Sequence, residues 1–382
     1  MKFVLFYHSL VSDWNHGNAH FLRGVASELI ARGHEVEIYE PEAGWSLRQL
    51  IETEGQAAAQ GYRSAYPELH SHFYRADTLD VEAVLEGADV VLVHEWNEPE
   101  LVARIGRSAS RLGCTVLFHD THHRSVTDPN AMSAMDLRHY DGVLAFGQAI
   151  AERYVEKGWA DRVWVWHEAA DTRRFKPLAP VEKEGDLVWI GNWGDDERSD
   201  ELREFLIDPV AQLQLRSKIH GVRYPSDALD ALRAANIEYG GWIANYQVPA
   251  VFARYACTVH VPRRAYAQSL PGIPTIRMFE ALACGIPLVS APWSDSEHLF
   301  RPGQDYLVAR NGEEMRECLR ALLADSAYAS RIAASGLETL LSRHTCAHRV
   351  DELLAVIREL DAHAMPLKGT DMRAGLTAAR LR

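Results

Sequence analysis

The sequence predicts an α/β protein with two facing, doubly wound domains. Short apolar runs of strand length alternate with amphipathic helical stretches, the pattern of parallel sheets that are covered by helices on both faces. This alternation is interrupted near residues 177–186, where prolines and charged residues gather, and it then starts again. A chain of 382 residues is long enough for two domains that each bury a core of their own.

The first half contains six apolar runs that we expect to form strands, at residues 2–8, 35–40, 89–94, 114–119, 142–146 and 162–166. The clearest helix between them covers residues 19–32, carries its apolar residues on one stripe and ends at Gly33. Residues 42–75 have only a weak pattern, for which we expect an extra helix and a loop.

The second half repeats the scheme, with strands expected at residues 187–191, 218–220, 237–239, 257–261, 287–290 and 306–309, followed by long helices. The predicted domains are residues 1–172 and 187–343, joined by a linker at 173–186. A helix at 344–365 can pack back on the first domain, and the tail at 366–382 has no periodic apolar stripe. Both sheets should present the carboxyl ends of their strands to one deep cleft.

Composition excludes several classes of protein. A net charge of −13 argues against a surface that coats nucleic acid, and no apolar stretch is long enough to span a bilayer. Polar residues interrupt the first apolar run too early for a signal peptide. The five cysteines are odd in number and lack C-x-x-C spacing, which is typical of buried thiols in a reducing compartment. We therefore expect a cytoplasmic, soluble protein.

The most informative segment runs from Thr275 to Ser290. Arg277 and Glu280 are three residues apart and share one face of an apolar helix. Gly285 suits the left-handed cap of that helix, and a buried strand follows it. This arrangement predicts a ligand-binding charged pair at the edge of a sheet; the alternative is a solvated surface salt bridge, which contributes little.

The same segment carries a family resemblance. "FEALACGIPLVS" (279–290) is similar to the "EAMACGLPVV" stretch of the retaining GT-B glycosyltransferases of family 4, typified by sucrose and mannosyl transferases. The preceding arginine and "HTCAHRVDELL" (344–354) look like the CgeB-type branch of that superfamily. Residues 16–41 resemble the first loop and helix of the family, and "WHEAADTRRFKP" (166–177) resembles its "NGVDTERFRP" stretch. These motifs occur in the order of the family and span most of the chain.

The resemblance implies a GT-B, Rossmann-like enzyme that moves a sugar from a UDP- or GDP-sugar to an unknown acceptor, without a metal or another cofactor. Retention of the anomeric configuration is slightly favoured. One alternative is a GT-B nucleotide-sugar epimerase or hydrolase. Another is a degenerate GT-B protein that only binds a nucleotide sugar, because Gly272 stands where the retaining family has a glutamate that contacts the donor sugar.

Candidate donor-binding residues lie in the second half. Arginine neutralises charge on phosphate oxygens with a permanently charged fork, so Arg277 is the first candidate. Arg198 is the second, since it follows a loop containing Asn192 that resembles the phosphate-contacting segment of the family; alternatively, it only balances the acidic run at 195–197. The resemblance assigns the ribose hydroxyls to Glu280. Backbone amides at Gly272 and Ile273 can reach the sugar or diphosphate, and Trp242 can stack on the base.

His119 and Asp120 end a predicted strand and should therefore reach the cleft, where the resemblance places a catalytic histidine. Such a histidine can hydrogen-bond the donor sugar or shuttle a proton near neutral pH. Together with His122 and His123, these residues also permit a metal site. We rank the metal lower, because GT-B enzymes typically need no ion for their chemistry.

The loop at residues 8–20 should also face the cleft. Gly17 lets the backbone approach a ligand, and the loop lacks the G-x-G-x-x-G spacing of a dinucleotide-binding protein. If transfer inverts the sugar, Asp13, His16 or His20 can act as the base; alternatively, each of them stabilises the start of the following helix. Trp96 follows another strand and can stack on an acceptor sugar.

Overall fold

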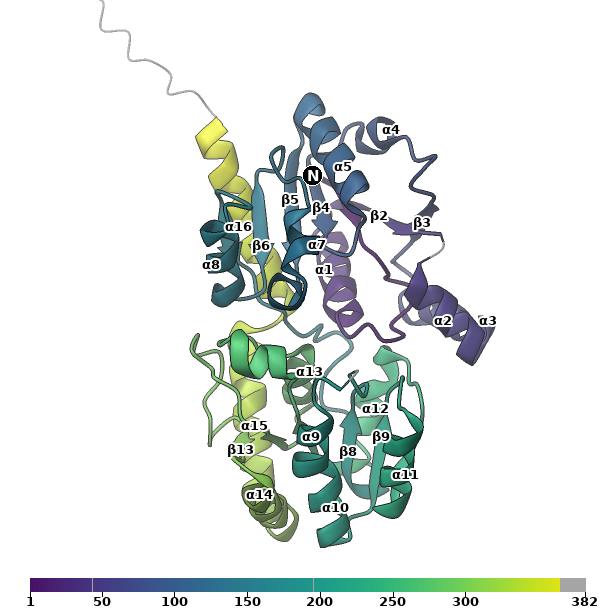
Figure 1. Ribbon diagram of the computed structural model, residues 1–382, viewed down its shortest axis with the longest axis vertical. Coiled ribbons are helices and arrows are strands. Elements are labelled where there is room, and N and C mark those ends of the chain that lie inside the picture. The colour runs from purple at the N-terminus through teal and green to yellow at the C-terminus, as the bar shows by residue number, and fades with distance from the viewer. Residues whose placement is uncertain (43, 195, 365–382) are drawn as a thin grey trace, which may run out of the picture.

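The computed structural model describes residues 1–42, 44–194 and 196–364, which form two α/β halves stacked along the long axis of the molecule (Figure 1). Each half is built around one parallel sheet, of seven strands in the N-terminal half and six in the C-terminal half. The predicted fold class is therefore confirmed. The tail predicted at 366–382 lies outside the described residues.

The N-terminal sheet has the order β3-β2-β1-β4-β5-β6-β7, and each neighbouring pair is parallel. The strands are β1 (Lys2–Phe6), β2 (Glu35–Pro41), β3 (Ser71–Tyr74), β4 (Val90–His94), β5 (Thr115–Asp120), β6 (Gly142–Ala145) and β7 (Val163–Val165). All residues of β4 are buried, as expected for a strand between two helical layers. Because β1 pairs with both β2 and β4, the winding reverses between β1 and β4, and a crevice forms at their carboxyl ends.

Eight helices are described in this half: α1 (Ala19–Ala31), α2 (Trp45–Glu54), α3 (Gln56–Ala65), α4 (Val81–Leu85), α5 (Pro99–Leu112), α6 (Arg124–Thr127), α7 (Pro129–Ser133) and α8 (Gln148–Glu156). The helix predicted at 19–32 is confirmed as α1. The weakly patterned region at 42–75 contains α2, α3 and the edge strand β3. This strand was missing from the prediction, because its two central residues are exposed and give no apolar run.

The C-terminal sheet has the order β10-β9-β8-β11-β12-β13 and is also parallel. Its strands are β8 (Gly185–Ile190), β9 (Ser217–His220), β10 (Ile237–Tyr239), β11 (Tyr255–His260), β12 (Leu288–Ser290) and β13 (Leu307–Val308). The second reversal lies between β8 and β11, so the carboxyl ends of these strands also border a crevice.

The helical segments of this half are α9 (Ser199–Leu202), the π-helix η1 (Arg203–Ile207), α10 (Asp208–Leu213), α11 (Ser226–Ala234), the 3-10 helix η2 (Asn245–Gln247), α12 (Val248–Phe252), the π-helix η3 (Ala265–Ser269), α13 (Ile276–Cys284), α14 (Gly312–Ala324) and α15 (Ser326–Arg343). Gly285 caps α13 in the left-handed conformation with φ 65°, as the sequence predicts.

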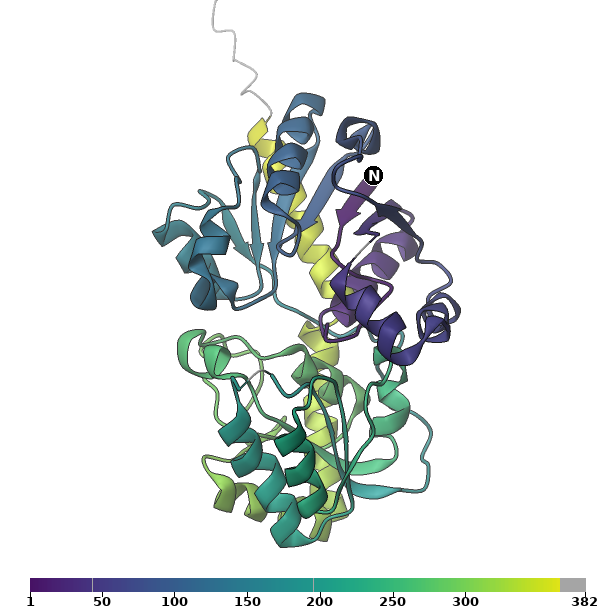
Figure 2. The ribbon, with the colours of Figure 1, turned by 45° about the vertical axis from the view of Figure 1, so that its right-hand side comes forward.

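The last described helix, α16 (Cys346–Ala364), returns to the N-terminal half and packs against α1 (Figures 1 and 2). Its Val350, Leu353 and Ile357 belong to the same buried cluster as Phe21 of α1. The two segments that cross between the halves lie side by side, since Ala170 N donates to His344 O at 3.0 Å and Cys346 N donates to Ala170 O at 3.0 Å. The chain thus crosses between the halves twice, and the two crossings are adjacent.

All five cysteines are unpaired thiols, and Cys114, Cys257 and Cys346 are buried. None of the helices in the described ranges combines the length and apolar character that crossing a bilayer requires.

Candidate functional site

A cleft of about 740 Å³ lies between the two halves, at the carboxyl ends of both sheets. Its N-terminal wall comes from the loops that follow β1, β2, β4 and β5, and its C-terminal wall comes from the loops after β8 and β11 and from the start of α13. Both reversals of strand order therefore face the same space, which is where doubly wound sheets bind ligands.

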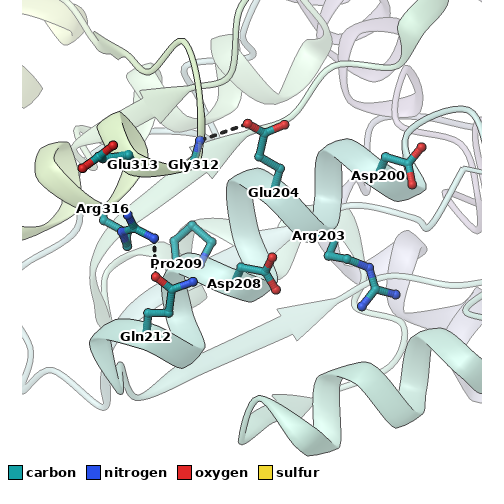
Figure 3. Close-up of a pocket in the computed structure, with 9 residues that line it drawn as sticks. All are labelled: Asp200, Arg203, Glu204, Asp208, Pro209, Gln212, Gly312, Glu313 and Arg316. Atoms are coloured by element: carbon teal, nitrogen blue, oxygen red, sulfur yellow. Dashed lines mark hydrogen bonds between the residues drawn. The ribbon is translucent and has the colours of Figure 1, made fainter.

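A second hollow, of about 240 Å³, lies on the outer side of the C-terminal half between η1, α10 and α14 (Figure 3). Its charged side chains have both signs, and two of them form hydrogen bonds within the hollow: Glu204 accepts from Gly312 N at 3.1 Å, and Arg316 bonds to Gln212. Because it is far from the carboxyl ends of the strands, the interdomain cleft is the candidate site.

Arginines dominate the C-terminal wall of the cleft. Arg198, Arg263 and Arg277 all line it. Burial, together with the charges of Arg263 and Arg277, lowers the pKa of Arg198 to about 9, so that this side chain remains charged at neutral pH. Guanidinium groups gathered in one wall create a local positive field in a protein of net charge −13, and such a field suits a diphosphate.

Arg198 is held in place by backbone carbonyls. It donates to Val261 O at 2.7 Å and to Asn192 O at 2.5 Å, and its guanidinium lies 5.1 Å from the ring centroid of Trp189. Arg277 projects from the first turn of α13 with a quarter of its side chain exposed, and it pairs with Glu280 as the spacing predicted. Arg277 is thus more accessible to a ligand than Arg198, which is almost fully buried.

The structure corrects the prediction that Glu280 faces the ligand. Its side chain is 0% exposed, does not line the cleft and accepts hydrogen bonds from Asn245 Nδ2 at 2.6 Å and from Arg277. His20 Nε2 accepts from Asp171 N at 2.7 Å, so His20 Nδ1 carries the proton and donates to Glu280 Oε1 at 2.9 Å. Burial alone would raise the pKa of Glu280, but Arg277 and these donors hold it below its ordinary value. Glu280 therefore positions Arg277.

Asp13 and His20 are not bases in the cleft, contrary to one interpretation of the sequence. Both join the first loop and α1 to the C-terminal half. Asp13 pairs with the fully buried Arg23 at 2.9 Å and accepts hydrogen bonds from Asn245 N at 3.0 Å and Trp242 Nε1 at 3.1 Å. All of these groups are occupied with structural contacts, and neither Asp13 nor His20 lines the cleft.

Trp242 also differs from its prediction. Its indole donates to Asp13 and packs beside Trp14, Leu50 and Val222, so it does not line the cleft where a nucleobase would stack. Asn192 does line the cleft, and its Nδ2 donates to Asn15 Oδ1 at 2.7 Å across the two halves.

His119 and Asp120 end β5 as predicted, but both are 0% exposed and lie behind the cleft lining. Burial lowers the pKa of His119 to about 3, so the ring cannot shuttle protons near neutral pH. Asp120 accepts hydrogen bonds from Tyr154 OH at 2.8 Å and His122 N at 3.0 Å, and burial raises its pKa to about 6. The residues of this loop that line the cleft are Thr121, His122 and His123.

Gly272 and Ile273 are likewise turned away from the cleft. A Cβ atom on Gly272 would lie 2.5 Å from Glu297 Oε1, so the Glu297 side chain fills the space that a side chain at 272 would need. Glu297 in turn accepts from Gln148 N at 2.9 Å and pairs with His167 Nε2 at 3.0 Å, while Ile273 is buried in the core of the N-terminal half. This segment closes the two halves together instead of presenting amides to a ligand.

Three first-domain candidates do line the cleft: His16, Gly17 and Trp96. A Cβ atom on Gly17 would lie 3.1 Å from Ile276 Cγ2 and 3.8 Å from Arg277 Nη2, so this glycine allows the first loop to approach α13. Trp96 is 43% exposed, and Arg124 lies 4.6 Å from its ring centroid. His16 is a poor base, because burial and the neighbouring His8 hold its pKa well below the ordinary value.

No three His, Cys, Asp or Glu side chains within residues 1–42, 44–194 and 196–364 are grouped so that they could hold a metal ion. Of the four residues that permit a metal site in the sequence, His122 and His123 line the cleft, whereas His119 and Asp120 do not.

Sequence reasoning missed several residues of the cleft, among them Glu168, Arg263 and Tyr266. Glu168 sits in the "WHEAAD" segment that crosses between the halves. Arg263 follows β11 and pairs with Glu197 at 2.7 Å, and the ring of Tyr266 lies 5.1 Å from that of His123. A polar residue just after a parallel strand was a usable signal for Arg263; nothing in the sequence singled out Tyr266.

The buried histidines predict that the protein is sensitive to acid. Burial lowers the pKa of His8, His119, His260 and His344 to about 3, whereas an unfolded histidine has a pKa near 6.5. Between these values the unfolded chain binds more protons, so the free energy of unfolding falls by about 1.4 kcal/mol per pH unit for each such ring as the pH drops.

Buried acids with raised pKa, such as Asp120, offset part of this loss because the folded state binds their protons first. We expect the urea midpoint to fall markedly from pH 7 to pH 5. His119→Leu removes one of these rings, so the free energy of unfolding of this variant should depend less steeply on pH, by the equivalent of about one proton. An unchanged midpoint over this range would contradict the neutral, buried state of these rings.

Two protein-family models match the chain. The model described as "Glycosyl transferase-like" matches residues 198–355, and the model described as "Glycosyltransferase Family 4" matches residues 16–174. The two matches cover the two structural halves. No curated protein sequence matches the chain.

Solved structures of glycosyltransferases share the fold. Sucrose-phosphate synthase from Thermosynechococcus elongatus superposes with a TM-score of 0.62 at 15% identity, over 95% of this chain and 100% of that chain. A glycosyltransferase from Rickettsia africae gives 0.66 at 10% identity, over 95% and 99%. HepE from Anabaena, solved in complex with UDP-glucose, gives 0.64 at 15% identity, over 94% and 100%.

At such low identities these structures establish the two-domain arrangement, and the family matches establish the class of enzyme. Both halves of the chain match glycosyltransferase models, and the cleft lies where the fold binds its ligands. The chain belongs to the GT-B glycosyltransferases of the group 1 and family 4 type.

Proposed function

We propose that this enzyme transfers a sugar from a nucleoside diphosphate sugar, with UDP-sugars as the first donors to test, to a hydroxyl group of an acceptor bound in the interdomain cleft. The observation that carries the proposal is the wall formed by Arg198, Arg263 and Arg277. HepE of Anabaena, which has the same fold, was solved with UDP-glucose, and this supports UDP as the nucleotide.

In the proposed reaction, the bond between the sugar C1 and the diphosphate oxygen breaks, and a bond from C1 to the acceptor oxygen forms. Negative charge builds on the departing phosphate, where the guanidinium group of Arg277 stabilises it. Arg198 and Arg263, in the same wall, add to the positive field. The acceptor approaches from the N-terminal wall, where Trp96 offers an exposed ring.

Retention of the anomeric configuration is our choice. Inversion needs a general base, but Asp13 and His20 are engaged between the halves, and the pKa of His16 is held low. Under retention, the departing phosphate takes the proton of the acceptor. We further propose that the arginines supply the positive charge for which other transferases use a metal ion, so that the reaction proceeds without one.

The test is a thermal-shift series with UDP, UDP-glucose, GDP and GDP-mannose in EDTA. A ligand that binds only the folded state stabilises it by about 2.7 kcal/mol when its concentration is a hundred times its Kd. Either UDP and UDP-glucose or GDP and GDP-mannose should therefore raise Tm measurably. Nucleotide release in EDTA should then depend on an added acceptor extract. Nucleotide release without any acceptor would favour an epimerase or hydrolase, and binding without release would favour a binding protein. Activity that is lost in EDTA and restored by a divalent ion would contradict metal independence.

A further inference from the structure

Glu168 stands out among the acidic residues of the cleft. It belongs to the segment that crosses between the halves, it is only 2% exposed, and it lines the cleft. Its Oε1 is buried and has no hydrogen-bond partner among the described residues. A buried polar group without a partner is costly, so a residue of this kind indicates a binding role.

The other acids of the cleft differ from Glu168. Glu197 is paired with Arg263 at 2.7 Å, and Glu98 is exposed to solvent. Glu280 and Glu297 have several partners each and do not line the cleft. Glu168 is thus the carboxyl group that is enclosed, faces the ligand space and has an oxygen, Oε1, without a partner among the described residues.

The charged groups near Glu168 indicate which part of a nucleotide-sugar donor it can contact. Burial and the neighbouring carboxylate of Glu280 raise the pKa of Glu168, while Arg277 opposes that rise. Arg277 and Glu168 both line the cleft. A carboxyl group repels phosphate oxygens but pairs well with hydroxyl groups, which a sugar offers beside its diphosphate.

We propose that Glu168 binds a hydroxyl group of the transferred sugar and so contributes to the choice of donor. This inference rests on the proposed function, because it requires the diphosphate at Arg277. The sugar is bonded directly to that diphosphate, so its ring must lie next to Arg277, where Glu168 faces the same space. Gly272, where the retaining family has its donor-sugar glutamate, cannot take this role, since Glu297 occupies its side-chain space.

The test compares a nucleotide with its own sugar conjugate. UDP, UDP-glucose, GDP and GDP-mannose are titrated into the wild type, Glu168→Ala, Glu168→Gln and the control Glu184→Gln, which alters an exposed residue paired with Arg254. In Glu168→Ala, the Kd of the nucleotide sugar should rise about 10-fold or more while the Kd of the free nucleotide stays within about 2-fold. Glu168→Gln keeps a hydrogen-bonding group and should recover much of the loss.

Protein stability provides a second readout. Removing a buried carboxyl group whose Oε1 has no partner among the described residues should leave Tm equal to or above that of the wild type, so weaker binding cannot be attributed to unfolding. Unchanged affinity for the nucleotide sugar, or equal losses for nucleotide and nucleotide sugar, would overturn the role of Glu168 while the proposed function stands. Failure of the wild type to bind any of the four ligands would overturn both.

Discussion

Arg277→Ala is expected to lower kcat/KM by about 10²–10³-fold, which is the usual effect of removing one preorganised group that stabilises charge in a transition state. Arg277 opens α13 at the cleft, a quarter of its side chain is exposed, and Glu280 holds the guanidinium in place. Alanine removes both the charge and the fork that contacts the phosphate oxygens. The measurement is steady-state kinetics together with UDP titration.

The variant series separates chemistry from folding. Arg277→Ala removes one partner of the buried Glu280, so Arg277→Ala/Glu280→Gln, which has no such unpaired charge, should recover stability without recovering activity. Arg277→Lys keeps the charge without the planar fork and should fall between the wild type and alanine. Arg254→Ala, in an exposed pair, is the matched control. Wild-type kcat/KM and UDP affinity in a folded Arg277→Ala protein would contradict the proposed function.

The pair formed by Arg277 and Glu280 also shows how far sequence reasoning can go. Spacing along a helix predicted that the two side chains meet, and they do. It did not predict that one faces the cleft and the other is enclosed, because that depends on His20, which is 260 residues away in the chain. Helix periodicity gives the faces of an element, but the long-range partner decides which face the ligand meets.

The fold was more accessible to prediction than the site, for a physical reason. Strands such as β4 are buried on both faces and therefore appear as continuous apolar runs, whereas β3 lies at the edge with two exposed residues and escaped notice. The position of His119 at the end of β5 was correctly predicted, but its exposure was not. In a parallel strand, successive side chains point to opposite faces, and the sequence does not state which of them the next layer covers.

Asp13→Ala is expected to reduce the free energy of unfolding by about 3–5 kcal/mol, since it leaves the fully buried Arg23 without its counter-charge. It also leaves the Asn245 N–H and the Trp242 indole N–H without their acceptor, so the contact between the two halves weakens. Urea denaturation followed by tryptophan fluorescence measures the change.

Asp13→Asn distinguishes this structural role from catalysis. If Asp13 were the general base, the variant would lower kcat by about 10²–10⁴-fold even in fully folded protein. We expect instead a loss of stability with kcat nearly unchanged at a temperature where the variant is folded. Asp77→Ala, which removes an exposed partner of Arg75, is the control and should leave the urea midpoint unchanged. A stable but inactive Asp13→Asn protein would restore the first-loop base.

The return of α16 to the N-terminal half has a consequence for biosynthesis. Phe21 and the other apolar residues of α1 leave the ribosome well before the helix that covers them, which contributes Val350, Leu353 and Ile357 to the same cluster. The first half therefore waits with an uncovered apolar surface while nearly the whole C-terminal half is synthesised. Ribosome-bound chains that stop before residue 346 should bind chaperones through this surface, and the emergence of α16 should end that binding.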